Sequence, residues 1–480
     1  MAGTRKMTVF TLSMMTVAAV VSLRGLPLMA KEGLTMIFYL LFAAIMFLIP
    51  ASLVAAELGG AFSDKGGGVY TWIKEAFGSR WGFTAIWLQW IQNVVWYPTV
   101  LAFAASALAY LFMDPELADD GVYTGIVILV CYWGATFLTL AGSNIASKVT
   151  KYGVMLGTLL PGVIIIVLGL FWINQGNPIQ FLHPSAAVAA AEKLAGEAPH
   201  ARLFPHLSGL GSVSFLAGII LLFAGVEVHA VHANELENPK KQFPASVFLA
   251  AVIIFSLFLM GSMAVAAVIP EEKISLTAGL MQALKQLLDV YHLGFLTPIM
   301  GLLAAFGAIG GVMSWVGGPS KGLLQTAKEG EIPPFMAKVN KNGVQVNILL
   351  IQAAIVSILA CFYFVMDNVS VAFFMLSAMT ITLYLVVYIL MYAAAIRLRY
   401  TQPDLPRSYK VPGGNAGMWA LAGVGLVGVV FSLVVGFFPP INLPVSNPTL
   451  YVGLVTAGMV IFVGLPLWIN AIKKPEWKQE

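Results

Sequence analysis

Long apolar runs recur along the whole chain, each about 20 residues or longer, the length of helix that crosses the hydrocarbon core of a bilayer. Backbone polar groups find no water in lipid, so such runs must fold as helices whose hydrogen bonds close within each segment. The pattern therefore predicts an all-α integral membrane protein with twelve transmembrane helices. Their expected ranges are 8–30, 34–58, 82–112, 121–142, 150–174, 210–235, 243–269, 291–323, 346–366, 368–397, 416–437 and 449–471.

Composition and the distribution of charge support this class. Of the 480 residues, 59% are hydrophobic and only 10% are charged, whereas soluble domains carry about 25% charged residues. Basic residues collect at alternate ends of the predicted spans, as they do in cytoplasmic loops. This alternation predicts an even number of spans with both termini in the cytoplasm. Arg5 and Lys6 precede an apolar run too long for a signal-peptide core, so the first helix is expected to be retained.

Several function classes lack support in the sequence. No nucleophile–base pair, phosphate-binding loop or metal-ligand cluster occurs with suitable spacing, so we expect neither an enzyme nor a bound cofactor or metal. Basic residues are dispersed rather than grouped with aromatic ones, which does not support nucleic-acid binding. Cys131 and Cys361 both fall inside apolar spans, which favours buried thiols over a disulfide framework.

The segment from Leu216 to Pro244 combines features that a soluble core helix rarely has. An apolar run reaches Gly225-Val226-Glu227 and continues through His229 and His232. A glycine, a carboxylate and two imidazoles therefore lie at the centre and inner end of a segment that is apolar enough to enter the bilayer. Such a pattern is typical of a helix interrupted at a binding site, with polar groups that line a cavity instead of facing lipid.

A second interruption is predicted in the first span, at Ser22-Leu23-Arg24-Gly25-Leu26-Pro27. Spans one and six would each begin a set of five, and because five is odd the two sets would insert with opposite orientation. Paired interruptions at corresponding positions indicate a transporter site at the membrane midplane. The alternative is that Gly25 and Pro27 merely kink a helix. The expected organisation is a first repeat over 1–175, an extracellular loop over 176–209, a second repeat over 210–400, and two further helices with a short tail over 401–480.

Three groups of residues resemble motifs of the amino acid–polyamine–organocation superfamily of transporters. They are Pro50–Gly59 with Gly66–Trp72 and Lys74–Gly78; Gly225–Glu227 with Glu237–Lys240 and Pro244; and Ser314–Gly322 with Pro333, Asn340–Gly343 and Val346. Within the superfamily, the chain is most similar to the bacterial glutamate/γ-aminobutyrate antiporters. The resemblance implies a LeuT-like fold of five plus five helices in inverted repeats, followed by two more helices. It also implies exchange or proton-coupled uptake of amino acids.

The chain departs from this group in three places. The first span lacks the common Gly-Ser-Gly interruption and carries Val20-Val21-Ser22 instead. Arg24 stands where the antiporters carry an aromatic residue, so their substrate cannot simply be transferred. The long C-terminal plug of the antiporters is also missing, which puts the pH gating attributed to that plug in doubt here.

A broken helix can bind an α-amino acid through its backbone. Free N–H groups at the start of the outer half attract a carboxylate, and free carbonyls at the end of the inner half attract an ammonium. We therefore expect backbone recognition at Val21, Ser22, Leu23 and Gly25 in span one, and at Phe223, Ala224 and Gly225 in span six. The alternative is ordinary packing of two kinked helices.

Arg24 and Glu227 leave two interpretations open. A guanidinium near the membrane centre is costly unless it is paired or faces water. Arg24 can bind a second carboxylate of an acidic substrate, or it can pair with Glu227 in a purely structural role. Glu227 is accordingly either a gating or proton-carrying group, or a structural hydrogen-bond acceptor.

Other polar and aromatic residues are weaker candidates. Gln89, Gln92, Asn93, Trp96 and Tyr97 recur at helical spacing in span three and are expected to face the cavity or to join helices; of these, Asn93 and Tyr97 are expected at the substrate. By the resemblance, the Trp315 ring covers the substrate, with apolar packing as the alternative. His229 and His232 lie one turn apart and titrate at mildly acidic pH, although structural hydrogen bonding is the commoner role of such residues. Glu57 and Glu235 are expected to pair with loop lysines such as Lys148, Lys240 and Lys321.

The leading hypothesis is an exchanger in a bacterial inner (plasma) membrane that works by alternating access on acidic or zwitterionic amino acids, such as glutamate and γ-aminobutyrate. A proton-coupled or facilitative transporter of neutral amino acids or amines is the alternative within transport. A non-transporting amino acid sensor is the alternative from another class. The expected partners are small amino acids and the lipid bilayer. The sequence does not distinguish a monomer from a homodimer.

Overall fold

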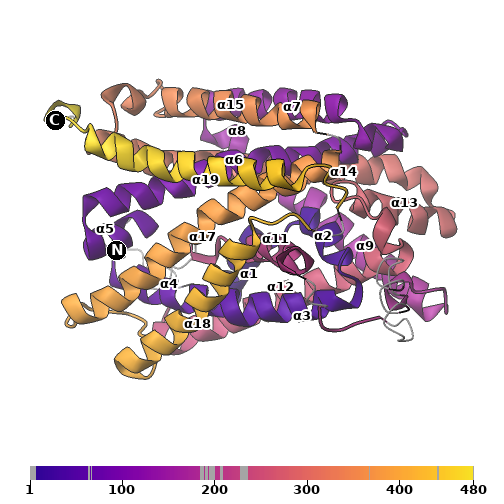
Figure 1. Ribbon diagram of the computed structural model, residues 1–480, viewed down its shortest axis with the longest axis horizontal. Coiled ribbons are helices and arrows are strands. Elements are labelled where there is room, and N and C mark those ends of the chain that lie inside the picture. Colours follow the sequence, from indigo (N-terminus) through magenta and orange to yellow (C-terminus); the bar gives the residue numbers. More distant parts are fainter. Residues whose placement is uncertain are drawn as a thin grey trace.

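The computed structural model is a bundle of long helices that run in the same general direction (Figure 1). It describes residues 7–62, 65, 68–183, 189, 193, 201–205, 209–227, 236–366, 368–440 and 443–478. Within these ranges there is no β-strand, and only two isolated bridges pair Met7 with Leu236 and Val339 with Gln345. The all-α class predicted from the apolar runs is thus observed.

Ten helical segments of the described chain are long and apolar enough to cross a membrane. They are Gly33–Ala61, Ser79–Leu111, Gly121–Ala141, Lys148–Asn174, Pro239–Val268, Gly294–Lys328, Val346–Val365, Val369–Thr401, Gly414–Val435 and Pro448–Ala471. Each agrees with a predicted span to within a few residues at either end. The other two predicted spans, 8–30 and 210–235, are the ones in which the helix is interrupted.

The first half of the chain contains these interruptions and two stretches of wider helix. Its elements are α1 (Val9–Val20), η1 (Leu23–Gly25), α2 (Leu26–Ala30), η2 (Gly33–Thr35), α3 (Met36–Ala43), η3 (Ala44–Leu48), α4 (Ile49–Ala61), α5 (Val69–Phe77), α6 (Ser79–Leu111), η4 (Pro115–Asp119), α7 (Gly121–Ala141), α8 (Ser143–Tyr152), η5 (Gly153–Leu159), α9 (Leu160–Asn174) and η6 (Gln180–Leu182). The segments η3 and η5 are π-helical turns inside longer helices, a local form that often occurs at functional sites.

The second half begins with the other interrupted helix. Its elements are η7 (Leu210–Val213), α11 (Phe215–Phe223), α12 (Pro239–Val268), η9 (Glu271–Lys273), α13 (Gly279–Val290), η10 (Gly294–Leu296), α14 (Thr297–Lys328), η11 (Pro334–Ala337), α15 (Val346–Ala360), α16 (Phe362–Val365), α17 (Val369–Thr401), α18 (Gly414–Val435), α19 (Pro448–Ala471) and η12 (Pro475–Trp477). Helix α5 and the C-terminus lie at one end of the bundle, and α13 lies at the other (Figure 1).

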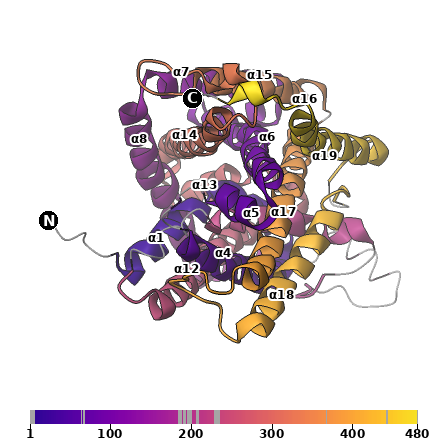
Figure 2. The same cartoon turned by 90° about the vertical axis from the view of Figure 1, so that its left-hand side faces the viewer.

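Three long helices form the framework around which the interrupted ones are arranged. Helix α6 packs extensively against both α14 and α17, and most of the central part of α6 and of α17 is buried. By contrast, α18 and α19 lie at the edge of the bundle (Figure 2). Only 11% of the most apolar 18-residue stretch of α19 is buried inside the protein. Apolar surface of this kind is suited to contact with lipid.

Close packing between α6 and α14 depends on small residues. A Cβ atom on Gly301 of α14 would lie 2.5 Å from the carbonyl oxygen of Ala107 in α6. Without a hydrophobic driving force between helices in lipid, such close approach is a main source of helix association. The glycine therefore helps to hold the framework together.

Gly301→Ala is expected to destabilise the protein by about 1–3 kcal/mol, because α14 has to move away from the α6 backbone. Gly134→Ala in α7 is the matched control, since a Cβ atom there meets nothing within 4 Å. Thermal unfolding of both variants in the same detergent measures the difference. Equal unfolding temperatures would show that the two helices do not pack as closely as described.

Candidate functional site

The first interruption lies between α1 and α2. Helix α1 ends at Val20, the N–H of Val21 donates to the Val17 carbonyl, and Ser22 is extended with φ −138° and ψ 128°. The chain then enters the 3₁₀ turn η1, whose first N–H groups have no helical partner upstream. Of the four predicted residues of span one, Val21 and Gly25 have N–H groups bonded to the backbone, whereas no described backbone hydrogen bond involves the N–H of Ser22 or Leu23.

The second interruption follows Phe223, where α11 ends. Ala224 is extended (φ −72°, ψ 152°) and Gly225 has φ +103°, a left-handed conformation that favours glycine. The Gly225 N–H donates to the Tyr388 hydroxyl of α17 at 2.9 Å. A break in this position thus has a specific hydrogen-bond partner on the central framework.

Glu227 is held by the same surface of α17. Its carboxylate is 2% exposed and accepts hydrogen bonds from the hydroxyls of Tyr384 and Tyr388. Gln89 of α6 lies at a longer distance, 3.4 Å from Nε2 to Oε1. Among the described contacts of Glu227 there is no ion pair with Arg24. The structural pairing of these two residues, one of the two interpretations of the sequence, is therefore not observed.

A cavity of about 110 Å³ lies between the two interruptions and the helices α6, η5 and α14. Seven of the predicted site residues line it: Val21, Ser22, Leu23, Arg24, Asn93, Ala224 and Trp315. Gln92, Trp96 and Ser314 add polar and aromatic groups, and Tyr384 connects the cavity wall to Glu227. Arg24 is the only charged group among the described residues of the lining.

Four predicted site residues have other positions. Gly25 packs against Leu222, Phe223 is buried against Phe258, and Tyr97 is buried against Tyr132 with ring centroids 5.2 Å apart. These three do not line the cavity, because their helices turn them toward neighbouring helices. Gly225 lies beside the cavity, where its Cα faces the indole of Trp315. His229, His232 and Glu235 lie outside the described residues.

Arg24 is buried, with 4% of its surface exposed, and is surrounded by aromatic rings. Its Cζ atom lies 5.5 Å from the ring centroid of Trp96 and 5.6 Å from that of Phe373. Its Nη1 donates to the Thr99 hydroxyl at 2.9 Å. No carboxylate among the described residues pairs with it, and its Nε has no hydrogen-bond partner there.

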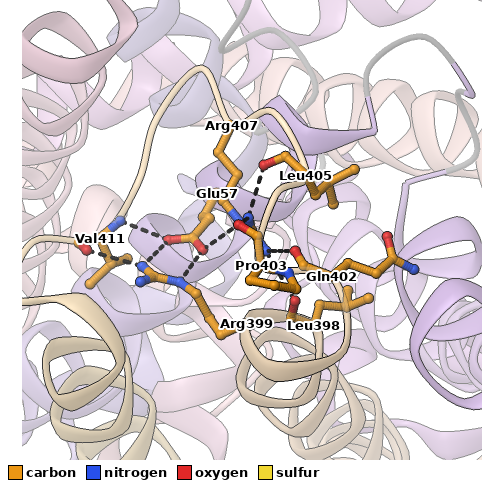
Figure 3. Close-up of polar contacts among 8 residues, drawn as sticks. All are labelled: Glu57, Leu398, Arg399, Gln402, Pro403, Leu405, Arg407 and Val411. Carbon is orange, nitrogen blue, oxygen red and sulfur yellow. Dashed lines mark hydrogen bonds and ion pairs between the residues drawn. The ribbon is translucent and has the colours of Figure 1, made fainter.

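Glu57 has different partners from those expected. Arg399 of α17 donates to both of its oxygens, at 2.5 and 2.6 Å, and the Arg407 Nε lies 3.0 Å from Oε1 (Figure 3). The Val411 N–H also donates to Oε2 of Glu57, at 2.7 Å. The expected pairing with loop lysines is therefore wrong: Glu57 is buried, and its ion pairs among the described residues are with Arg399 and Arg407. A guanidinium offers a buried carboxylate several donors in a planar fork, which a lysine does not.

The residues that hold Arg24 and Glu227 in place were not predicted from the sequence. Thr99 and Phe373 orient Arg24, whereas Tyr384 and Tyr388 orient Glu227. One signal was present, since Tyr384, Tyr388 and Tyr392 recur every four residues and therefore share one face of a buried helix.

Comparison with known proteins gives a consistent result. Residues 7–463 match the family described as amino acid permease. An uncharacterised transporter of Legionella pneumophila is 40% identical over 98% of this chain and 97% of its own length. A glutamate/γ-aminobutyrate antiporter of Lactococcus lactis is 32% identical over 96% of this chain and 90% of its own length. A probable agmatine/putrescine antiporter of the same species is 24% identical over 96% and 94%, respectively.

Tyr388→Phe is expected to destabilise the protein by about 1–3 kcal/mol, because it leaves the Gly225 N–H and one Glu227 oxygen without a partner in the bilayer interior. Tyr392→Phe is the matched control one turn further along α17, since the Tyr392 hydroxyl has no partner among the described residues. Thermal unfolding of the purified variants tests this. If Tyr392→Phe lowered the unfolding temperature as much as Tyr388→Phe, the assigned role of Tyr388 would be contradicted.

Proposed function

This chain belongs to the amino acid permease family, and on that premise we propose that it exchanges acidic or zwitterionic amino acids across a bacterial inner membrane. The family and the apolar helices identify an integral membrane transporter. The proposal adds the mode of transport and the class of substrate. Glutamate and γ-aminobutyrate are the first candidates, because a relative of that description spans nearly the whole chain.

The observation that carries the proposal is the cavity between the two helix interruptions. Its volume of about 110 Å³ leaves room for on the order of ten water-sized groups, which is close to the size of a small amino acid. Peptide N–H groups at the start of η1 suit a carboxylate, and carbonyls at the ends of the helices α1 and α11 suit an ammonium. Trp315 lies across Gly225, where its ring can cover a bound molecule.

The architecture proposed with this function has twelve spans. The two interrupted segments, 8–30 and 210–235, would be spans one and six of a LeuT-like fold with five-plus-five inverted repeats. Residues 1–175 and 210–400 would form the repeats, with 176–209 outside and both termini in the cytoplasm. Alternating access would then arise from movement of one group of helices against another around the cavity.

A proton-coupled or facilitative transporter of neutral amino acids or amines is the second candidate. The observation that favours it is Glu227, a buried carboxylate joined to the cavity through Tyr384. Such a group can carry a proton when the cavity opens to one side. His229 and His232, predicted to lie one turn apart on the inner half-helix, would be further candidates for this role.

Exchange is tested by uptake into proteoliposomes that contain the purified protein. Labelled glutamate or γ-aminobutyrate outside should enter several times faster when the same unlabelled amino acids are inside, at some pH between about 5 and 8. The physical reason is that the carrier should change from one open side to the other faster with an amino acid bound. In the empty carrier the buried charge of Arg24 has no anion beside it.

Three other outcomes separate the alternatives. Uptake that does not depend on internal amino acid, but does depend on a proton gradient, would overturn exchange and favour symport. Uptake that depends on neither would indicate a facilitative transporter. Thermal stabilisation by amino acids without any flux would identify a sensor.

A further inference from the structure

Arg24 is held in one orientation by three residues from two helices of the framework. The rings of Trp96 in α6 and Phe373 in α17 both approach its guanidinium, and Thr99 accepts from Nη1. Thr99 in turn donates to the Trp96 carbonyl at 2.7 Å, which leaves its lone pairs for Arg24. A side chain fixed in this way is ready to bind a ligand without further ordering.

The charge of Arg24 is not balanced by the described protein. Its Nε lacks a hydrogen-bond partner among the described residues. The buried carboxylate near the cavity, Glu227, is occupied by two tyrosine hydroxyls. An isolated charge is costly in the membrane interior, so the Arg24 guanidinium should be stabilised by a bound anion.

We propose that Arg24 is the specificity-determining residue that binds a second carboxylate of the substrate, so that acidic amino acids are preferred over their neutral analogues. This inference rests on the proposed function. Peptide groups at the interruptions would bind the α-carboxylate and the ammonium, and Arg24 would bind the side-chain carboxylate. Arg24 and this carboxylate would then form an ion pair in the occluded complex, whereas a neutral side chain would leave the Arg24 guanidinium without an anion.

The test compares glutamate with glutamine, which has nearly the same shape but no second charge. Wild-type protein should take up glutamate with a KM about 10- to 100-fold below that for glutamine, the range expected for hydrogen bonds to a charged group. Arg24→Gln should abolish this preference, so that KM for glutamate rises at least to that for glutamine. Thr99→Val removes the acceptor for Nη1 together with the hydrogen bond to the Trp96 carbonyl but keeps the Arg24 charge, and it should raise KM for glutamate more than for glutamine.

An unchanged glutamate-to-glutamine ratio in folded Arg24→Gln protein would overturn the proposal, as would a wild type that does not distinguish the two. If Arg24→Gln does not fold, the same comparison is made with Arg24→Lys and Thr99→Val. Both variants should still weaken the preference for glutamate over glutamine. Exchange of glutamine by a variant without preference leaves the proposed function intact. Absence of any exchange in wild-type protein would instead refute the proposed function.

A different observation concerns the Glu57 cluster, defined as Glu57, Arg399, Arg407 and Val411. It joins α4, the end of α17 and the loop before α18 through buried side chains, none of whose charged groups is more than 4% exposed (Figure 3). The same loop contacts α12, since Tyr409 and Phe243 have ring centroids 5.9 Å apart. Separating a buried carboxylate from two guanidiniums leaves unpaired charges in an apolar environment.

A second polar contact at this end of the bundle is much more exposed to solvent. Lys74 of α5 lies 2.9 Å from Glu329, just past the end of α14, with 39% and 31% of their side chains exposed. Tyr70 also donates to Glu329. An exposed ion pair contributes little and separates at low cost. We infer that the Glu57 cluster is a joint that stays closed during transport, and that the bundle opens at this end between α5 and α14.

Cysteine crosslinks distinguish the two contacts in a Cys131→Ser, Cys361→Ser background. A Cβ atom on Gly60 would lie 3.5 Å from that of Ser408, within the range of a disulfide, so Gly60→Cys with Ser408→Cys should link α4 to the loop. Oxidised protein should keep most of its uptake. Lys74→Cys with Glu329→Cys, joined by a short bifunctional maleimide, should lose uptake, whereas each single cysteine treated alike should not.

Loss of uptake on oxidation of the Gly60–Ser408 pair, with recovery on reduction, would show that the Glu57 cluster opens and would overturn the first part of this inference. Undiminished uptake after crosslinking at Lys74 and Glu329 would overturn the second part.

Discussion

Interrupting a helix inside a bilayer exposes peptide groups where water cannot satisfy them, and the rest of this structure is arranged around that constraint. The chain leaves the helical conformation after Val20 and again after Phe223. At the second interruption, Tyr388 binds the Gly225 N–H and Glu227 together, so a single side chain of α17 supports both the turn and the carboxylate that follows it. At the first, the free groups belong to residues that line the cavity. The breaks are therefore tolerated where a framework helix or a ligand can supply the missing partners.

Two buried arginines show how differently the protein treats charge. Arg399 is matched by Glu57, with further support from the Val411 carbonyl. Arg24 has aromatic rings and one hydroxyl, but no carboxylate among the described residues. In the first arrangement the protein itself supplies the carboxylate, which suits a structural joint. The second is incomplete and lines the cavity, which is why we assign its charge to the substrate.

Much of the fold could be predicted from the sequence, because length and hydropathy alone define a membrane span. The ten uninterrupted segments and the two breaks follow from apolar runs, glycines and prolines that are close together in the chain. The motifs also indicated the family to which residues 7–463 belong. These features are local, and membrane insertion restricts what each segment can become.

The contacts between distant segments could not be predicted in the same way. Glu57 and Arg399 are separated by 342 positions, and nothing local distinguishes Arg399 from the loop lysines as a partner. Tyr97 and Phe223 belong to the correct helices, but the rotation of those helices turns them away from the cavity. The sequence also could not show whether Glu227 pairs with Arg24. This depends on the position of α17, whose residues Tyr384 and Tyr388 donate hydrogen bonds to Glu227.

The most direct test of the central claim is an experimental structure of the protein with L-glutamate bound in lipid nanodiscs. We expect a glutamate in the cavity beside Trp315, with its side-chain carboxylate on the Arg24 guanidinium and its α-carboxylate at the N–H groups of η1. An empty cavity at saturating glutamate, or an Arg24 paired with a carboxylate of the protein itself, would contradict it.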